Sequence, residues 1–152
     1  MKLTPHFTLS EITASAKARQ IGVDNTPPPE LLPRLVLLAE LLERIRTRLA
    51  VPVTVTSGYR SPLVNRAVGG VTSSDHTQGH AADFVAPGFG TASDVAATLA
   101  PLVSVLGIGQ IILEGVKGKQ WVHVSTRAPE KSVNRVLTIT DAGVVPGIVR
   151  LA

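Results

Sequence analysis

The chain has 152 residues, of which 44% are hydrophobic, and its 15 Lys and Arg against 11 Asp and Glu give a formal net charge of +4. This length suits one domain with one core, residues 1–152, and the apolar content excludes an intrinsically disordered chain. The absence of cysteine excludes disulfides, thiolate metal sites, iron–sulfur clusters and cysteine nucleophiles, so any metal must be held by His, Asp or Glu.

Helices are expected to dominate the first half of the chain. Residues 8–11 have the spacing of a capping box, which predicts the start of a short helix. Over residues 30–49, leucine and isoleucine recur every three or four positions and predict a helix with one apolar stripe. Residues 51–56 alternate valine with proline or threonine and predict a half-buried strand. Ser61, followed by a proline, predicts a helix that ends at the glycine pair 69–70.

Strands are expected to dominate the second half. After a loop over 71–79, the sequence predicts a strand at 81–86 and a helix that runs over 91–106. Further strand-like segments are 110–114, 121–126, 133–140 and 144–151. The first two of these are predicted to form a hairpin centred on Lys117 and Gly118. The expected fold class is α+β, with a small antiparallel sheet packed against helices.

A histidine and an aspartate flank the start of the predicted strand at 81–86. His76 precedes Asp83 by seven residues, across small residues that allow close approach, so a His/Asp pair is feasible. His80 would share the opposite strand face from Asp83. The alternative, a helical metal pair of His76 and His80, requires a helix through Gly79 and lacks the glutamate that follows the first histidine of such motifs.

A third candidate ligand lies in the hairpin. Strand alternation places Trp121, His123 and Ser125 on one face, with the core valines on the other. The predicted register leaves Glu114 diagonal to His123, at roughly 7–8 Å, with room for a water between them. Two histidines, one aspartate and an open fourth position are typical of a hydrolytic zinc site, for which cobalt, nickel or manganese could substitute.

The same residues resemble a known family. The pattern Ser-x-His-x-x-Gly-x-Ala-x-Asp over residues 74–83 is similar to the metal motif of the zinc D-Ala-D-Ala carboxypeptidases, peptidase family M15. Trp-Val-His at 121–123 resembles the second motif of that family. Segments 3–11 and 57–70 are similar to its small phage-associated members. The resemblance covers about residues 1–126.

This resemblance implies a hedgehog/DD-peptidase-like fold and one Zn²⁺ per chain, bound by His76, Asp83 and His123. It implies that Arg60 holds a carbonyl or carboxylate of the substrate, a task suited to a planar guanidinium. Several members place the general base three residues before the last histidine, where this chain has Gln120. Other members place a glutamate at the end of the preceding strand.

The expected general base is therefore Glu114, which would accept a proton from the attacking water. Ser74 and His80 are expected to orient the metal ligands or to contact substrate. Trp121, next to the last ligand motif, belongs to the same group of supporting residues.

The expected function is hydrolysis of peptidoglycan stem peptides, as in a phage or prophage endolysin. The alternative is a non-catalytic, zinc-stabilised wall-binding or phage tail module on the same fold. The pattern leaves open which bond is cut. The positive charge favours an anionic envelope, whereas the dispersed cations predict no nucleic-acid partner. We expect a monomer without a signal peptide or membrane insertion, which stays cytoplasmic until its release to the cell wall or periplasm, or is carried on a virion.

Overall fold

The computed structural model describes residues 1–152. Its helices are α1 (Leu9–Thr13), α2 (Ala16–Ile21), α3 (Leu32–Leu49), α4 (Pro62–Ala67), α5 (Ala92–Leu99) and α6 (Val103–Leu106). Short 3-10 turns precede α3 and α6 and lie before the last strands, at Pro29–Leu31, Ala100–Leu102 and Ser132–Asn134. None of these helices is both long enough and apolar enough to span a lipid bilayer.

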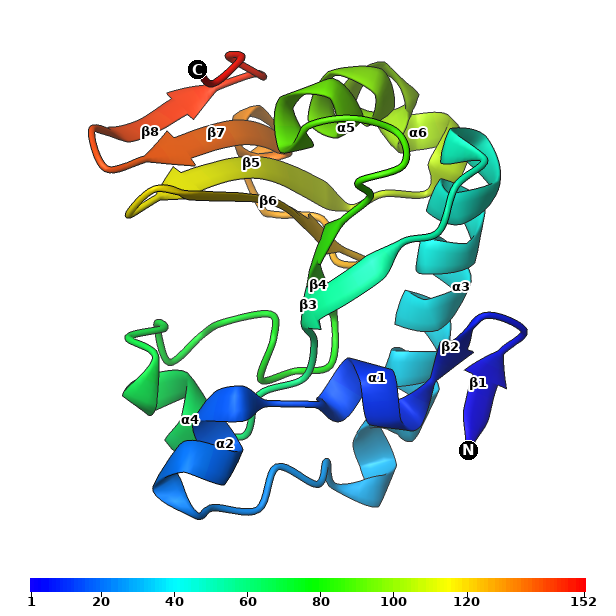
Figure 1. Ribbon diagram of the computed structural model, residues 1–152, viewed down its shortest axis with the longest axis vertical. Coiled ribbons are helices and arrows are strands. Elements are labelled where there is room, and N and C mark those ends of the chain that lie inside the picture. The colour runs from blue at the N-terminus through cyan, green and yellow to red at the C-terminus, as the bar shows by residue number, and fades with distance from the viewer.

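The strands form two sheets. A small antiparallel sheet pairs β1 (Lys2–Thr4) with β2 (Phe7–Thr8). The larger sheet has the order β3-β4-β6-β5-β7-β8. Its strands are β3 (Thr54–Ser57), β4 (Ala81–Val85), β5 (Gln110–Val116), β6 (Lys119–Ser125), β7 (Val136–Thr140) and β8 (Gly143–Pro146). Figure 1 shows this sheet beside α3, with α5 and α6 above it and α2 and α4 below.

The α+β class is confirmed, and a small antiparallel sheet is present, but the larger sheet was not expected. The main sheet has six strands and is mixed, because β7 runs parallel to β5 while every other pair is antiparallel. After β6 the chain crosses to the far side of β5, and β7 therefore enters the sheet in the direction of β5. No local sequence pattern records that crossing.

The core lies between α3 and one face of the large sheet. The apolar stripe of α3 supplies seven buried residues: Leu35, Leu38, Ala39, Leu41, Leu42, Ile45 and Leu49. Alternate residues of the central strands meet it, among them Phe84, Leu113 and Val124, which are fully buried. Because side chains alternate along a strand, residues between these positions face away from the core.

Most of the predicted elements are confirmed, and their ends differ for physical reasons. The hairpin is centred on Lys117 and Gly118, whose φ angles of 53° and 77° fit a two-residue turn with both central residues left-handed. The strand expected from residue 51 begins only at Thr54, beyond a proline that cannot donate to a ladder. The helix expected over 91–106 is broken after Leu99 by a 3-10 turn that contains Pro101.

The C-terminal segment is integrated into the fold. Beyond β8, Leu151 N–H donates to the hydroxyl of Ser93, and Arg150 forms an ion pair of 2.7 Å with Asp94. Both partners belong to α5, which packs against β5 and β6. The last residues therefore connect the edge of the sheet to the helix that covers it.

We predict that the buried side of β7 is essential for stability. Leu137 is 8% exposed on β7, whereas Val144 is 60% exposed on β8. Leu137→Ala should lower the free energy of unfolding by about 2–3 kcal/mol, because it leaves a cavity in a packed site. Val144→Ala should change it by less than about 0.5 kcal/mol. Urea unfolding followed by circular dichroism measures both, and equal effects would contradict this account of β7.

Candidate metal centre and active site

The large sheet brings two predicted ligands together. Asp83 on β4 lies directly opposite His123 on β6 in the antiparallel register. Their sequence neighbours, including Phe84, Val122 and Val124, are fully buried in the core. The alternation of the strands therefore directs Asp83 and His123 to the opposite face of the sheet, where they form a cross-strand pair.

His76 reaches the same place from the loop before β4. Its Nε2 lies 3.4 Å from Oδ1 of Asp83, and the same oxygen lies 3.0 Å from Nδ1 of His123. The two imidazole rings meet edge to face, with centroids 5.1 Å apart. One donor atom of each residue lies within 4.8 Å of the other two, so a single metal ion could be shared by the three.

The backbone fixes the orientation of His76. Its Nδ1 lies 2.7 Å from the carbonyl oxygen of Gly58, which can only accept, so Nδ1 carries the proton. With Nδ1 engaged by the backbone, Nε2 is the nitrogen available to a metal beside Asp83, as in metal sites where a second partner sets the histidine tautomer. The hydroxyl of Ser74 accepts a hydrogen bond from the His76 N–H at 3.2 Å. Ser74 thus supports the loop that carries this ligand.

The electrostatics of the cluster favour a cation among its donors. Burial alone would raise the pKa of Asp83, but hydrogen bonds with His123 and His76 outweigh it and hold that pKa far below its usual range. Burial lowers the pKa of His123, but its hydrogen bond with Asp83 outweighs this effect and raises it. Without a metal, a proton held between Asp83 and the imidazoles provides the positive charge of this cluster. A divalent ion can replace that proton, so the donor set fits a metal.

Glu114 lies at the same face, toward the far end of β5. It pairs with Trp121, and Ile112 pairs with His123, so the predicted diagonal relation of Glu114 to His123 is confirmed. Burial, followed by the negative charge of Asp83, raises the pKa of Glu114. The charge of His123, followed by the indole of Trp121 and the charge of Arg60, offsets this increase in pKa only in part.

Arg60 brings a positive charge to this group. Burial lowers the pKa of its guanidinium, and the charges of Asp83 and Glu114 counteract that effect. Its Nε is buried and has no hydrogen-bond partner. The backbone on both sides of Arg60 is held by Asn25, whose amide donates to the Tyr59 carbonyl and accepts from the Ser61 N–H. The backbone around Arg60 is therefore held in place, and its side chain lines the cavity beside the cluster.

A cavity of about 480 Å³ opens beside this cluster. Its lining comes from α2, β3, α4, β4 and β6 and from the segments that adjoin them. Asp83, Arg60 and Trp121 all contribute to the wall. The side chain of Asp83 keeps 13% of its surface exposed, so the cluster is accessible from this cavity. Three of the predicted site residues therefore line one cavity.

Sequence reasoning missed a network that fixes the metal loop to the sheet. The carboxylate of Asp75, 9% exposed, accepts from the Ser125 hydroxyl at 2.9 Å and from Arg127 Nε at 2.7 Å. Asp75 is the neighbour of His76, and Ser125 is two residues after His123 on β6. The network therefore ties the two histidine-bearing segments together. In the sequence, the only indication of this network is that a polar residue lies close to each histidine.

His80 lies outside the cluster. Its Nδ1 contacts the hydroxyl of Thr126 at 3.3 Å, and its backbone carbonyl accepts from the Thr126 N–H at 2.9 Å.

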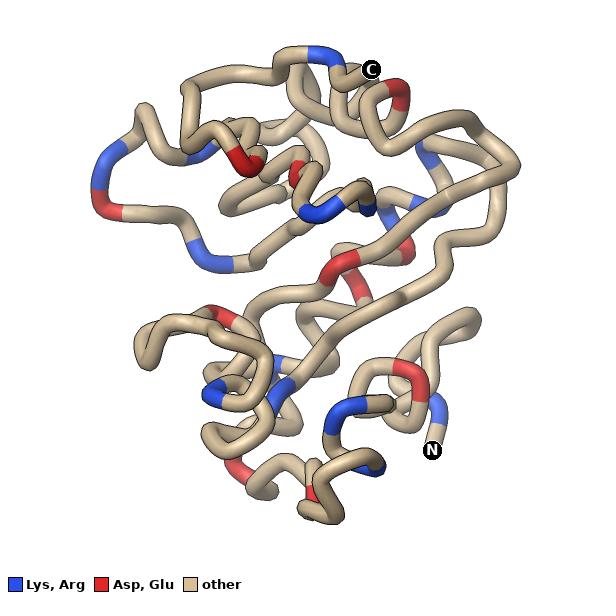
Figure 2. Tube along the Cα trace, turned by 60° about the vertical axis from the view of Figure 1, so that its left-hand side comes forward, with Lys and Arg blue, Asp and Glu red and all other residues tan.

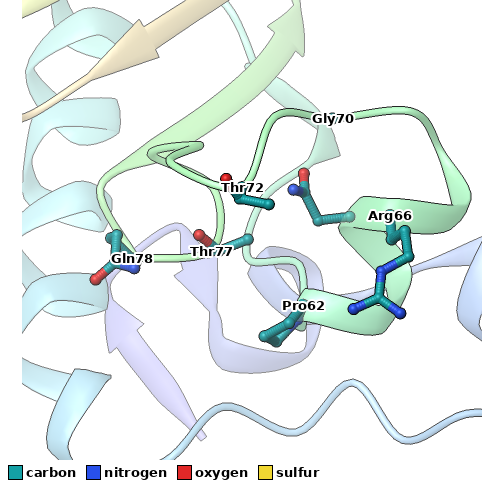
Figure 3. Close-up of a pocket in the computed structure, with 7 residues that line it drawn as sticks. Pro62, Arg66, Gly70, Thr72, Thr77 and Gln78 are labelled. Carbon is teal, nitrogen blue, oxygen red and sulfur yellow. The ribbon is translucent and has the colours of Figure 1, made fainter.

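A separate polar hollow of about 180 Å³ is lined by residues of α4 and of the 70–78 loop. Figure 3 shows Thr72 and Thr77 of that loop beside Arg66 and Pro62 of α4. None of the predicted site residues lines this hollow.

Comparison with known proteins identifies the family. The model of Peptidase M15 matches residues 5–125, four-fifths of the chain, and the chain belongs to this peptidase family. The matched range contains all three members of the metal-binding group. A search of curated proteins found no match. The resemblance inferred from the motifs is thus confirmed at the level of the family, and a hydrolase of the metallopeptidase type is supported.

We predict that Gly58 is essential both for packing and for the orientation of His76. A Cβ at this position would collide with the carbonyl oxygen of Ile12, which is backbone and cannot move aside. Gly58→Ala should therefore cost about 1–3 kcal/mol of stability and, by shifting the carbonyl that holds His76, weaken metal binding at least about 10-fold. Gly88→Ala, where a Cβ would meet the Val51 side chain at 3.4 Å, is the control. Thermal unfolding and zinc titration measure both effects.

Proposed function

We propose that this protein is a metal-dependent peptidase that hydrolyses the stem peptides of peptidoglycan. The proposal depends above all on one observation: a buried group of His76, Asp83 and His123 opens to a cavity that is also lined by Arg60. Membership of the M15 peptidase family supports the reaction class. Glu114, whose pKa is raised by burial and by Asp83, adds a proton acceptor beside the group.

In this proposal the ion is held by His76 Nε2, the Asp83 carboxylate and His123 Nδ1, the atoms that lie nearest one another. Two imidazoles and one carboxylate suit zinc first among the common divalent ions. When bound, such an ion polarises a carbonyl and makes water a stronger acid. Gly58 and the Asp75 network keep the imidazoles in position for it.

The other residues have separate roles. Glu114 accepts the proton of the attacking water and then delivers it to the leaving amine, and burial, by raising its pKa, improves it as an acceptor. Arg60, which lines the cavity, donates hydrogen bonds to the oxygen on which negative charge develops. Trp121 lines the wall of the cavity and pairs with Glu114 across the β5–β6 ladder.

The proposed site of action is the bacterial cell wall, in the manner of a phage or prophage lysin, on a hedgehog/DD-peptidase-like fold. The net charge of +4 favours association with an anionic envelope. Figure 2 shows Lys and Arg distributed along the whole chain and interspersed with acidic residues. This distribution suits general adhesion better than the concentrated basic face of a nucleic-acid-binding protein.

Removal of the proton acceptor should abolish cleavage and leave the metal in place. Glu114→Gln keeps the size of the side chain but cannot accept a proton, so release of peptides from purified sacculi should fall at least about 100-fold. The zinc content should stay at about one ion per chain, as expected for a site with a single set of ligands. Mass spectrometry of the muropeptides, with and without a chelator, measures cleavage and identifies the bond.

The matched control for this experiment is Glu130→Gln, which changes an exposed carboxylate outside the site. It should release peptides as fast as the wild type. Undiminished release by the Glu114→Gln variant would remove Glu114 from the role of proton acceptor. If the wild type itself cuts nothing, the alternative of a non-catalytic binding module is favoured.

Metal affinity should depend on one histidine and be insensitive to another. His123→Ala removes a proposed ligand and should weaken zinc binding more than about 100-fold, because loss of a direct ligand exceeds the effect of losing a supporting contact. His80→Ala should leave the affinity within about threefold, since its ring contacts Thr126 and not the cluster. Competition titration with a chromophoric chelator measures both. Similar losses in the two variants would contradict the ligand set.

A further inference from the structure

The cavity beside the metal group has a cationic rim that its proposed chemistry does not use. Lys17 on α2 and Lys119 at the start of β6 both line it, from elements far apart in the sequence. Neither forms an ion pair within the chain, whose ion pairs involve other residues. The two ammonium groups are therefore free to bind an external anion.

The charges that line the cavity are unbalanced. Lys17, Lys119 and Arg60 are cations, and Asp83 is the only acid in the lining. The Asp83 carboxylate is already engaged by two imidazoles. Glu114 lies close enough to Arg60 to act on its charge, so this carboxylate is matched with Arg60. Neither lysine then has an acidic partner in the chain. An anionic ligand would balance this excess of positive charge, and a neutral one would not.

The rest of the wall limits what that ligand can be. Five residues of the wall are apolar, and only one of these is aromatic: Ala14, Ala16, Val64, Val68 and Trp121. Three small hydroxyl residues complete it: Ser15, Thr56 and Ser57. Such a surface suits short aliphatic side chains, for example the methyl group of alanine. A carboxylate close to a small aliphatic group therefore matches both features of the cavity, and a bulky polyanion does not.

We propose that Lys17 and Lys119 form a carboxylate-binding subsite, which makes the enzyme selective for stem peptides with a free carboxylate near the scissile bond over the same peptides in amidated form. This inference rests on the proposed function. The charges of Asp83 and Glu114 act on Arg60, and in this proposal Arg60 binds the oxygen of the reacting carbonyl. The two lysines bind the substrate from separate elements and determine which stem peptide is accepted.

The expected preference for a free carboxylate depends on how exposed the two lysines are. Lys119 is exposed and Lys17 is half-buried, so each ammonium stays partly solvated when a carboxylate binds. A contact of this kind corresponds to about a 10-fold preference, below that of a fully buried charged hydrogen bond. The preference should also weaken with added salt, because dissolved ions screen the exposed charges.

The test uses four synthetic stem peptides with the isoglutamyl α-carboxyl and the C-terminal carboxyl each free or amidated. The zinc-loaded wild type should show a kcat/KM at least about 10-fold higher for one free carboxylate than for its amide, and this ratio should decrease between about 50 and 500 mM salt. Lys17→Gln and Lys119→Gln should each reduce the ratio to about threefold or less. Lys131→Gln, at an exposed position outside the cavity, should keep the wild-type ratio.

The outcomes separate this inference from the function on which it rests. Equal cleavage of free and amidated peptides, or an unchanged ratio in both lysine variants, would overturn the subsite and leave the peptidase intact. If no peptide is cut, the proposed function fails, and calorimetric binding of the same four peptides then decides the subsite. Tighter binding of a free carboxylate that is lost in both lysine variants would support it, and any other binding pattern would overturn it.

Discussion

The constraint that governs this structure is the placement of one carboxylate between two imidazoles. Asp83 accepts from His123 across the β4–β6 ladder and faces His76 from the preceding loop. A buried carboxylate is costly unless its oxygens are satisfied, and here the partners hold the pKa of Asp83 low enough to keep it ionised. The sheet and its loops are arranged so that this group remains satisfied yet accessible from the cavity.

The supporting contacts explain how a short, leucine-rich domain can hold such a polar group. The aliphatic core fills one face of the sheet, so the opposite face is free for the site. Backbone groups then perform much of the positioning: the Gly58 carbonyl orients His76, and the N–H of Arg60 donates to the His76 carbonyl at 3.2 Å. These contacts couple packing to chemistry, because the segment that carries Arg60 also holds a metal ligand.

The last part of the chain lies beyond the match to the family but belongs to the same sheet. β7 covers β5, the strand that carries Glu114, and pairs with it from Ile111 to Gly115. Without β7, β5 would be an exposed edge strand beside the site. The Gln120 side chain donates to the carbonyl of Ala152, so the C-terminus also contacts the hairpin. The C-terminal segment thus supports the strand that positions the proposed proton acceptor.

The sequence by itself determined the local parts: the leucine stripe of α3, the hairpin register, and the grouping of His76, Asp83 and His123. The stripe follows from helical spacing, and the register follows from a two-residue turn whose central residues adopt the left-handed conformation. The grouping follows from strand alternation and from a recognisable motif. Only the tertiary structure decided the parallel pairing of β7, the network of Asp75, and the meeting of Lys17 with Lys119 at one cavity. Those contacts join residues far apart in the chain, and their partners are selected by how the layers pack, which leaves no periodic pattern in the sequence.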